Sequence, residues 1–139
     1  MLTLTVYLLF DGTCADAMAF YHSCIGGELS VTRVGDSPMK DSMPPTQHRK
    51  VINATLKGGG VSISASDWLH PTRTPIQGNT VCLYISGAAY GELGDVFDKL
   101  AVGADANLLD NLREMPFGTY GALTDRFGVR WMFQGARQQ

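Results

Sequence analysis

The fold is decided by residues 2–27, which read LTLTVYLLFDGTCADAMAFYHSCIGG. Residues 2–10 form an apolar, β-branched run, and the turn dipeptide Asp11-Gly12 closes it. Such a run bounded by turn residues is typical of a strand. We therefore expect a strand over residues 2–10, with its end fixed by the turn.

A helix is expected directly after this strand. Thr13 can cap it, and Asp16 three residues later completes an approximate capping box. The apolar residues that follow have helical spacing: Ala17, Phe20, Tyr21 and Cys24. The glycine pair at Gly26 and Gly27 ends the predicted helix.

The same order of elements occurs a second time. Residues 80–86 predict a strand, and Leu93, Val96, Phe97 and Leu100 repeat the helical spacing before Gly103. Three short strands are expected after each helix. They cover residues 28–34, 49–56 and 61–66 in the first half, and residues 104–109, 120–124 and 129–133 in the second. Gly58, Gly59 and Gly60 allow the hairpin that joins the last pair of the first half.

Each half is thus a βαβββ module, which predicts an α+β fold. One helix covers only one face of a four-stranded sheet, so we expect the modules to form a curved mixed sheet around a cleft, with the helices on the outer face. The 139 residues are expected to form a single domain. Its modules are 1–66 and 79–139, and residues 67–78, rich in proline, are the linker.

Composition argues against several classes of partner. The chain is 45% hydrophobic and 17% charged, its net charge is −2, and its basic residues are scattered, so a nucleic-acid partner is not expected. The apolar opening lacks the basic start of a signal peptide, and no segment reaches the length of a membrane span. Three cysteines at irregular spacing are expected to be reduced thiols, so we predict a cytoplasmic protein.

Three segments of the chain resemble one family of proteins. The opening has Tyr7-Leu8-Leu9-Phe10-Asp11-Gly12, Ala17-Met18-Ala19-Phe20-Tyr21 and Gly26-Gly27-Glu28-Leu29, and the ending has Thr124-Asp125-Arg126-Phe127-Gly128-Val129-Arg130-Trp131-Met132. Ala65-Ser66-Asp67 and Gly78-Asn79 match between them. These motifs resemble the PhnB-like branch of the vicinal-oxygen-chelate superfamily, which includes glyoxalase I, extradiol dioxygenases and bleomycin-resistance proteins. The resemblance covers nearly the whole chain and implies the two-module fold and a homodimer.

The same branch carries the label of 3-demethylubiquinone methyltransferase-like proteins. A methyltransferase that uses S-adenosylmethionine would usually have a glycine-rich turn between a strand and a helix. Here the glycine run lies between two predicted strands. Methyl transfer is therefore not the activity that the residues favour.

The resemblance also implies where the metal ligands of the superfamily would lie. The matching positions are Val6, Ser64, Thr80 and Met132. Divalent ions of this kind need imidazole and carboxylate donors, which a valine and a thioether do not provide. No metal and no cofactor is therefore expected, and a metal-dependent glyoxalase or dioxygenase is disfavoured.

Strand alternation and the resemblance together give the expected lining of the cleft. The candidates are Val6, Leu8, Asn53, Ser64, Thr80, Tyr84, Phe117, Arg130 and Met132. Tyr7, Leu9, Leu83, Ile85, Trp131 and Phe133 would then pack beneath the helices. This lining is apolar with hydroxyls, one tyrosine and one arginine, which suits a small amphipathic ligand. Arg130 would meet an anionic or carbonyl group, or would be a solvated strand residue.

One cysteine and two expected loops could also take part in function, although each has a purely structural explanation. Cys14 lies in the first turn of the first helix, where the dipole would stabilise a thiolate, although a small half-buried residue is the favoured reading. Residues 35–47 and 110–118 read as long irregular loops, which act as lids in many proteins.

Three functions compete on this evidence. The first is a metal-free protein that binds a small organic molecule, as bleomycin-resistance relatives do. The second is a metal-independent enzyme, such as a lyase or isomerase, that uses Tyr84, Arg130 or a histidine on a small carbonyl compound. The third is a dimeric scaffold with a degenerate site, since open module edges must be paired or covered. The identity of the ligand, any catalysis, and pairing of the modules within one chain or across a dimer stay open.

Overall fold

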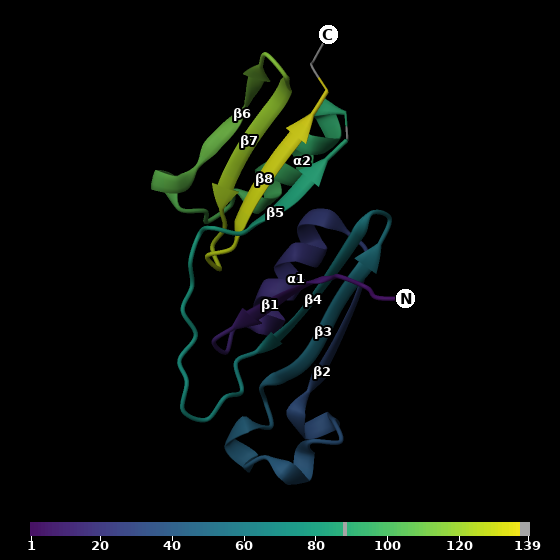
Figure 1. Ribbon diagram of the computed structural model, residues 1–139, viewed down its shortest axis with the longest axis vertical. Helices are drawn as coiled ribbons and strands as arrows, with labels where there is room; N and C mark the ends of the chain where they lie inside the picture. Colours follow the sequence, from purple (N-terminus) through teal and green to yellow (C-terminus); the bar gives the residue numbers. More distant parts are fainter. Residues whose placement is uncertain (88, 137–139) are drawn as a thin grey trace. The chain divides into compact units, whose positions relative to one another are not determined.

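The protein is described by a computed structural model that covers residues 1–87 and 89–136 (Figure 1). The chain divides into two compact units, Met1–Ile76 and Gln77–Gln139. Each unit holds one helix and one four-stranded mixed sheet, in the order strand, helix and three strands. The predicted α+β class and the repeated βαβββ order are confirmed.

The first unit is built on a sheet of order β1-β4-β3-β2. Its elements are β1 (Val6–Phe10), α1 (Cys14–Ile25), β2 (Glu28–Arg33), β3 (Val51–Gly58) and β4 (Val61–Asp67). β1 and β4 pair in parallel, whereas the other pairs are antiparallel. The parallel pair follows from the topology, because β4 returns beside β1 after the helix and a hairpin.

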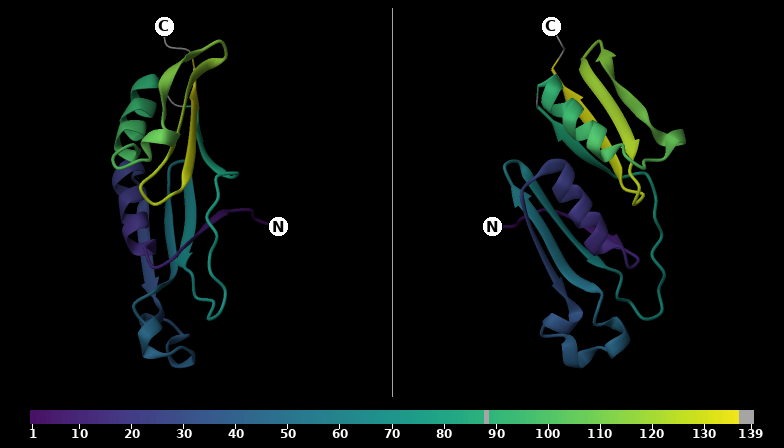
Figure 2. Two further views of the ribbon diagram at one scale, coloured as in Figure 1. Left: turned by 90° about the vertical axis from the view of Figure 1, so that its left-hand side faces the viewer. Right: turned by 180° about the vertical axis from the view of Figure 1, so that it is seen from behind.

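The core of this unit lies between α1 and one face of the sheet (Figure 2). The helix contributes Cys14, Ala17, Met18, Tyr21 and Cys24, all buried. The sheet contributes Val51, Ala54, Leu56, Ile63 and Ala65. Alternate residues of β3 and β4 point to this face, as the period of a strand requires. The other face of the sheet has no helix over it within the unit.

The first helix begins at Cys14 as predicted, but the capping box is wrong. Thr13 makes no side-chain cap bond. Instead the backbone N–H of Cys14 donates to Oδ1 of Asp67 over 3.0 Å, from the end of β4. A carboxylate from 53 residues away therefore caps the helix, and local sequence spacing carries no signal for it.

The second unit repeats this plan with a sheet of order β5-β8-β7-β6. Its elements are β5 (Cys82–Ser86), α2 (Tyr90–Leu100), β6 (Asp110–Met115), β7 (Gly118–Thr124) and β8 (Arg130–Gly135). Leu93, Phe97 and Leu100 of α2 are buried, and so are Trp131 and Phe133 of β8. The rings of Phe97 and Phe133 meet edge to face with centroids 5.1 Å apart.

The turn before β8 is held by one buried carboxylate. Oδ1 of Asp125 accepts backbone bonds from Phe127 and Val129, and Oδ2 accepts a bond of 2.8 Å from Nε1 of Trp131. The strands expected over residues 120–124 and 129–133 are thus joined by a tight turn as an antiparallel pair. Asp125 also fixes the indole of Trp131 beneath α2.

Two predictions for the second unit are wrong. The strand expected over residues 104–109 is a 3-10 turn, η4 (Ala106–Leu108), and the loop expected over 110–118 contains β6. Asp105 favours the turn because its side chain accepts from the N–H of Asn107. β6 was missed because it is an edge strand with a polar sequence, DNLREM, that pairs only with β7.

Smaller differences concern where strands and loops begin. β1 starts at Val6 rather than at residue 2, and β5 starts at Cys82 rather than at residue 80. The loop expected over 35–47 contains short 3-10 turns: η1 (Val34–Asp36), η2 (Lys40–Ser42) and η3 (Pro45–Gln47). Nε2 of His48 lies 2.9 Å from the Lys40 carbonyl and 3.0 Å from the Met43 carbonyl, so this side chain ties the loop together.

Candidate functional site

The open face of the first sheet carries a row of side chains that crosses three strands. Tyr7 pairs with Ser64, and Ser64 pairs with Thr55, so the three point the same way. Thr55 and the predicted candidate Ser64 therefore share this face. Asn53, two residues before Thr55 on β3, is exposed.

The predicted orientation of the β1 side chains is wrong, because the residues on its open face are shifted by one position. Val6 pairs with the buried Ile63, and Leu8 pairs with the buried Ala65, so both face α1. Tyr7 and Leu9 lie on the open face instead, 48% and 51% exposed. Every residue of β1 is apolar or aromatic, so the alternation that reveals a face is absent from the sequence.

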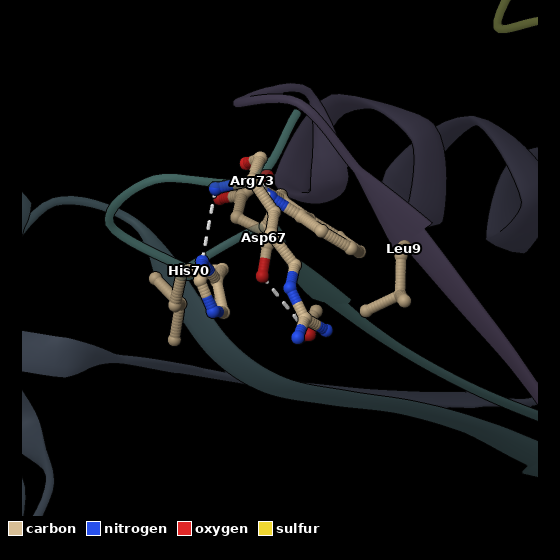
Figure 3. Close-up of a pocket in the computed structure, with 7 residues that line it drawn as sticks. Leu9, Asp67, His70 and Arg73 are labelled. Atoms are coloured by element: carbon tan, nitrogen blue, oxygen red, sulfur yellow. Dashed lines mark hydrogen bonds between the residues drawn. The ribbon is translucent and has the colours of Figure 1, made fainter. Parts of the chain in front are cut away.

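A pocket lies at one end of this open face (Figure 3). Its volume is about 260 Å³. Its lining residues are Leu9, Ser66, Asp67, Trp68, Leu69, His70 and Arg73. Leu9 comes from β1, and the others come from the end of β4 and the segment after it, so the pocket belongs wholly to the first unit.

Hydrogen bonds fold the segment after β4 into a wall of the pocket. The N–H of Trp68 donates to the carbonyl of Phe10, which extends the pairing of β1 and β4. Nε1 of Trp68 donates to the carbonyl of Arg73. Nδ1 of His70 accepts from the N–H groups of Thr72 and Arg73, at 3.2 and 2.9 Å. Sequence reasoning treated this segment as a linker and missed the site, although tryptophan, histidine and arginine within six residues were a signal.

The open face of the second sheet holds most of the residues expected there. Tyr84 pairs with Met132, and Cys82 pairs with Arg130, while Trp131 and Phe133 point to α2. Tyr84 is 53% exposed, and its hydroxyl donates to Oε1 of Gln134 over 3.0 Å. Tyr84, Arg130 and Met132 therefore lie on the face of this sheet that points away from α2.

Arg130 is held by its own unit. One guanidinium nitrogen donates to the carbonyl of Leu108 over 2.6 Å, and the other lies 3.5 Å from Oδ2 of Asp110. Because Asp110 begins β6, this side chain ties β8 to the edge of the sheet. A ligand that used Arg130 would have to share it with these partners.

Thr80 and Phe117 lie outside the strands. Thr80 is exposed and precedes β5. Phe117 occupies the turn between β6 and β7, and its ring meets that of Tyr120 with centroids 6.1 Å apart. Tyr120 pairs with Gln134, which places this aromatic pair beside the Tyr84–Gln134 bond.

Reactive and metal-binding groups are scattered. In the ranges 1–87 and 89–136, no group of three or more His, Cys, Asp or Glu side chains could hold a metal ion. Within the same ranges, no helix has the length and apolarity needed to cross a membrane. Cys14 is fully buried, and its burial, followed by the nearby Asp67 carboxylate, raises the pKa of its thiol to about 12, although Arg33 lowers it slightly. The thiol is therefore favoured over the thiolate, and Cys14 is more deeply buried than the half-buried position predicted for it.

The two βαβββ units place the chain in a known structural class. A glyoxalase/bleomycin resistance protein/dioxygenase from Nocardioides has the same fold, with a TM-score of 0.59 at 15% identity over 99% of this chain and 85% of that one. The chain has the fold of the glyoxalase, bleomycin resistance and dioxygenase superfamily.

The family within this class follows from closer relatives. The family model described as 3-demethylubiquinone-9 3-methyltransferase matches residues 3–134, and the chain belongs to this family. Protein PA1353 from Pseudomonas aeruginosa is 30% identical, with a TM-score of 0.80 over 99% of this chain and 100% of that one. A PhnB protein from Bacillus cereus is 28% identical, with a TM-score of 0.75 over 97% and 100%. The PhnB-like resemblance is confirmed.

Proposed function

We propose that the protein binds a small organic molecule on the open faces of its sheets, without a metal. The observation that carries this proposal is the half-exposed state of Tyr7, Leu9 and Tyr84, on sheet faces that no helix covers within the described part of each unit. Aromatic and aliphatic side chains gathered on an open face mark a binding surface rather than a core.

The chemistry of these faces suits an amphipathic ligand. Ser64 and Thr55 place hydroxyls beside Tyr7, and Gln134 holds the hydroxyl of Tyr84. Small-molecule sites combine apolar walls with a few oriented polar groups in this way. A carbonyl or hydroxyl compound with a hydrophobic body therefore fits better than a bare ion.

Binding is better supported than catalysis on these faces. An acid or base needs a proton position directed at the substrate. The hydroxyl proton of Tyr84 points to Gln134, and the guanidinium of Arg130 is engaged by Leu108 and Asp110. A metal-independent lyase or isomerase would have to break one of these contacts first.

The residues do not favour methyl transfer, despite the description of the family. Gly58 and Gly59 have positive φ and form the hairpin between β3 and β4. The turn from β1 into α1 has one glycine, Gly12. A glycine-rich turn from strand to helix is the usual cradle of a nucleotide-like cofactor, and this turn lacks its pattern.

The proposal also includes an oligomeric state and a cellular location. The sheets end in β1 and β2 and in β5 and β6, and such edges favour pairing with a second copy, which supports a homodimer. Sedimentation velocity measures this directly. Cys14 and Cys82 are free thiols, which suits a reducing compartment such as the cytoplasm.

Ligand retention tests the proposed function. The purified protein is mixed with a bacterial metabolite extract, separated from unbound compounds by gel filtration, denatured, and analysed by mass spectrometry. We expect one organic compound at close to one equivalent. Ser64→Trp, which fills the open face of the first sheet, should lower retention while circular dichroism stays unchanged.

Glu92→Gln, on the exposed first turn of α2, is the matched control and should retain the compound. Equal retention by all three proteins would contradict the proposal, as would the absence of any retained compound. Turnover of a panel of ketones and peroxides would favour the enzymatic alternative.

A further inference from the structure

The pocket beside Leu9 combines an aromatic wall with an unused cation. We propose that it takes a planar aromatic carboxylate, whose ring lies against Trp68 and whose carboxylate meets Arg73 and His70. This inference rests on the proposed function and names the chemical class of a ligand for the end of the first open face.

The wall is apolar and rigid. Leu9 is half exposed, and Trp68 and Leu69 are half-buried. The indole of Trp68 is held at Nε1 by the carbonyl of Arg73 and cannot turn freely. Tryptophan fixed in this way offers a flat surface at little cost in side-chain entropy, and flat aromatic ligands stack on such surfaces.

The guanidinium of Arg73 is available to a ligand, because the turn is held by the backbone of Arg73 and not by its side chain. Its N–H and carbonyl complete the turn with His70 and Trp68. In the part of the chain that the structure describes, its guanidinium has no hydrogen bond or ion pair. A guanidinium binds a carboxylate through two parallel hydrogen bonds, so a carboxylate is its natural ligand.

His70 adds a donor whose position is set by the turn. Nδ1 accepts from the N–H groups of Thr72 and Arg73, so this nitrogen carries no proton. Nε2 is therefore the ring nitrogen that can donate to a ligand. Figure 3 shows His70 and Arg73 on the same wall, with Leu9 across from them.

The negative charge in the lining, that of Asp67, is already satisfied. Its two carboxylate oxygens accept from the backbone N–H groups of Cys14 and Val51, at 3.0 and 2.8 Å. Nζ of Lys50 donates to the carbonyl of Trp68 over 3.4 Å, which adds a second cation near the pocket. An anion is thus favoured over a cation or a neutral compound.

The size of the pocket limits the ligand. A volume of about 260 Å³ lies just under the usual range for drug-sized ligands, about 300–1,000 Å³. A body of one or two fused rings fits such a space. A bare inorganic anion would leave the wall of Leu9, Trp68 and Leu69 without a partner.

Titration with 2-naphthoate, followed by ¹H–¹⁵N correlation spectra, tests the inference. The indole N–H of Trp68 should shift. That of Trp131, bound to Asp125 and buried beneath α2, should stay in place. The uncharged 2-naphthamide should bind at least about tenfold more weakly, because a charge-assisted hydrogen bond is roughly twice as strong as a neutral one.

Arg73→Gln should lower the affinity for 2-naphthoate at least about tenfold and leave that for 2-naphthamide unchanged. Arg113→Gln, an exposed arginine on β6, is the matched control and should behave as the wild type. An unchanged affinity in Arg73→Gln would overturn the inference. So would shifts confined to Tyr84 and Met132, which would leave the proposed function intact.

Absence of any shift with 2-naphthoate at millimolar concentration would also overturn the assignment of this pocket. The retention experiment with Ser64→Trp does not use this probe. Failure of the inference and failure of the proposed function are thus separate results.

Discussion

Asp67 joins the N-terminus of α1 to the end of β4, because its Oδ1 accepts the backbone N–H of Cys14 at 3.0 Å. Its Oδ2 accepts the N–H of Val51, the first residue of β3. The side chain is 3% exposed, so these bonds form away from water, where an acceptor that lost them would be costly. One carboxylate thus fixes three elements and the floor of the pocket.

Asp67→Asn should destabilise the first unit by about 2–4 kcal/mol, since hydrogen bonds to charged groups contribute about 1.5–3 kcal/mol each. The asparagine oxygen can replace one acceptor, but its NH₂ group would face a second N–H donor. Urea unfolding, followed by circular dichroism, measures the loss. Asp98→Asn, on the exposed side of α2, should change stability by no more than about 0.5 kcal/mol. Equal effects of the two substitutions would contradict this role.

Stability should fall above pH 9 because of Cys14. Burial raises the pKa of its thiol to about 12 in the folded protein, from 9.0 for an unburied thiol. Between these pH values the folded state therefore binds more protons than the unfolded state. The contribution is complete below pH 9 and is lost as the pH rises towards 12, at no more than about 1.4 kcal/mol per pH unit.

Urea unfolding at pH 8 and pH 10.5 measures how much the free energy of unfolding falls between these two pH values. Cys14→Ala should be less sensitive to the change of pH than the wild type, whereas Cys82→Ala, at an exposed position, should match the wild type. Identical slopes in all three proteins would show that Cys14 ionises normally.

Arg130→Gln should loosen the edge of the second sheet. It removes the bond to Leu108 and the ion pair with Asp110, so we expect a loss of about 1–3 kcal/mol, as for a broken charged hydrogen bond. Amide hydrogen exchange should speed up in β6 and stay unchanged in β5. Arg113→Gln is the control and should leave exchange in β6 unchanged. If β6 of Arg130→Gln exchanges as slowly as in the wild type, Arg130 does not hold this edge of the sheet.

Replacement of two glycines by alanine should change the stability of the protein in opposite directions. Gly118 has φ +132°, and a Cβ there would collide with the carbonyl oxygen of Gly135, so Gly118→Ala should destabilise by about 2 kcal/mol or more. Gly91, in α2, has open space around it, so Gly91→Ala should stabilise by about 0.5–1 kcal/mol through helix propensity. Thermal unfolding orders the three proteins, and a lower melting temperature for Gly91→Ala would contradict the prediction.

Much of the fold could be predicted because hydrophobic period and turn residues are local signals. The helical spacing of Leu93, Phe97 and Leu100 indicated the buried face of α2, and the glycines after Lys57 marked the β3–β4 hairpin. In CLYIS of β5 the exposed and half-buried residues alternate, as the period of a strand requires.

The missed features depend on partners far away in the sequence. β1 is apolar on both faces, and only its register with β4 shows that Tyr7 rather than Val6 lies with Ser64. The cap on α1 comes from Asp67, and β6 owes its pairing to β7. The pocket was overlooked because a proline-rich segment predicts a linker, whereas its Trp68 and His70 bonds fold it into a wall.

Retention of the organic compound by chelator-treated protein shows whether binding needs a metal. The protein is stripped with EDTA, its metal content is checked by mass spectrometry, and the metabolite retention is repeated with and without added divalent metal. We expect the same compound, at close to one equivalent, in both cases. Retention that disappears with the metal and returns when zinc, nickel or manganese is restored would contradict this expectation.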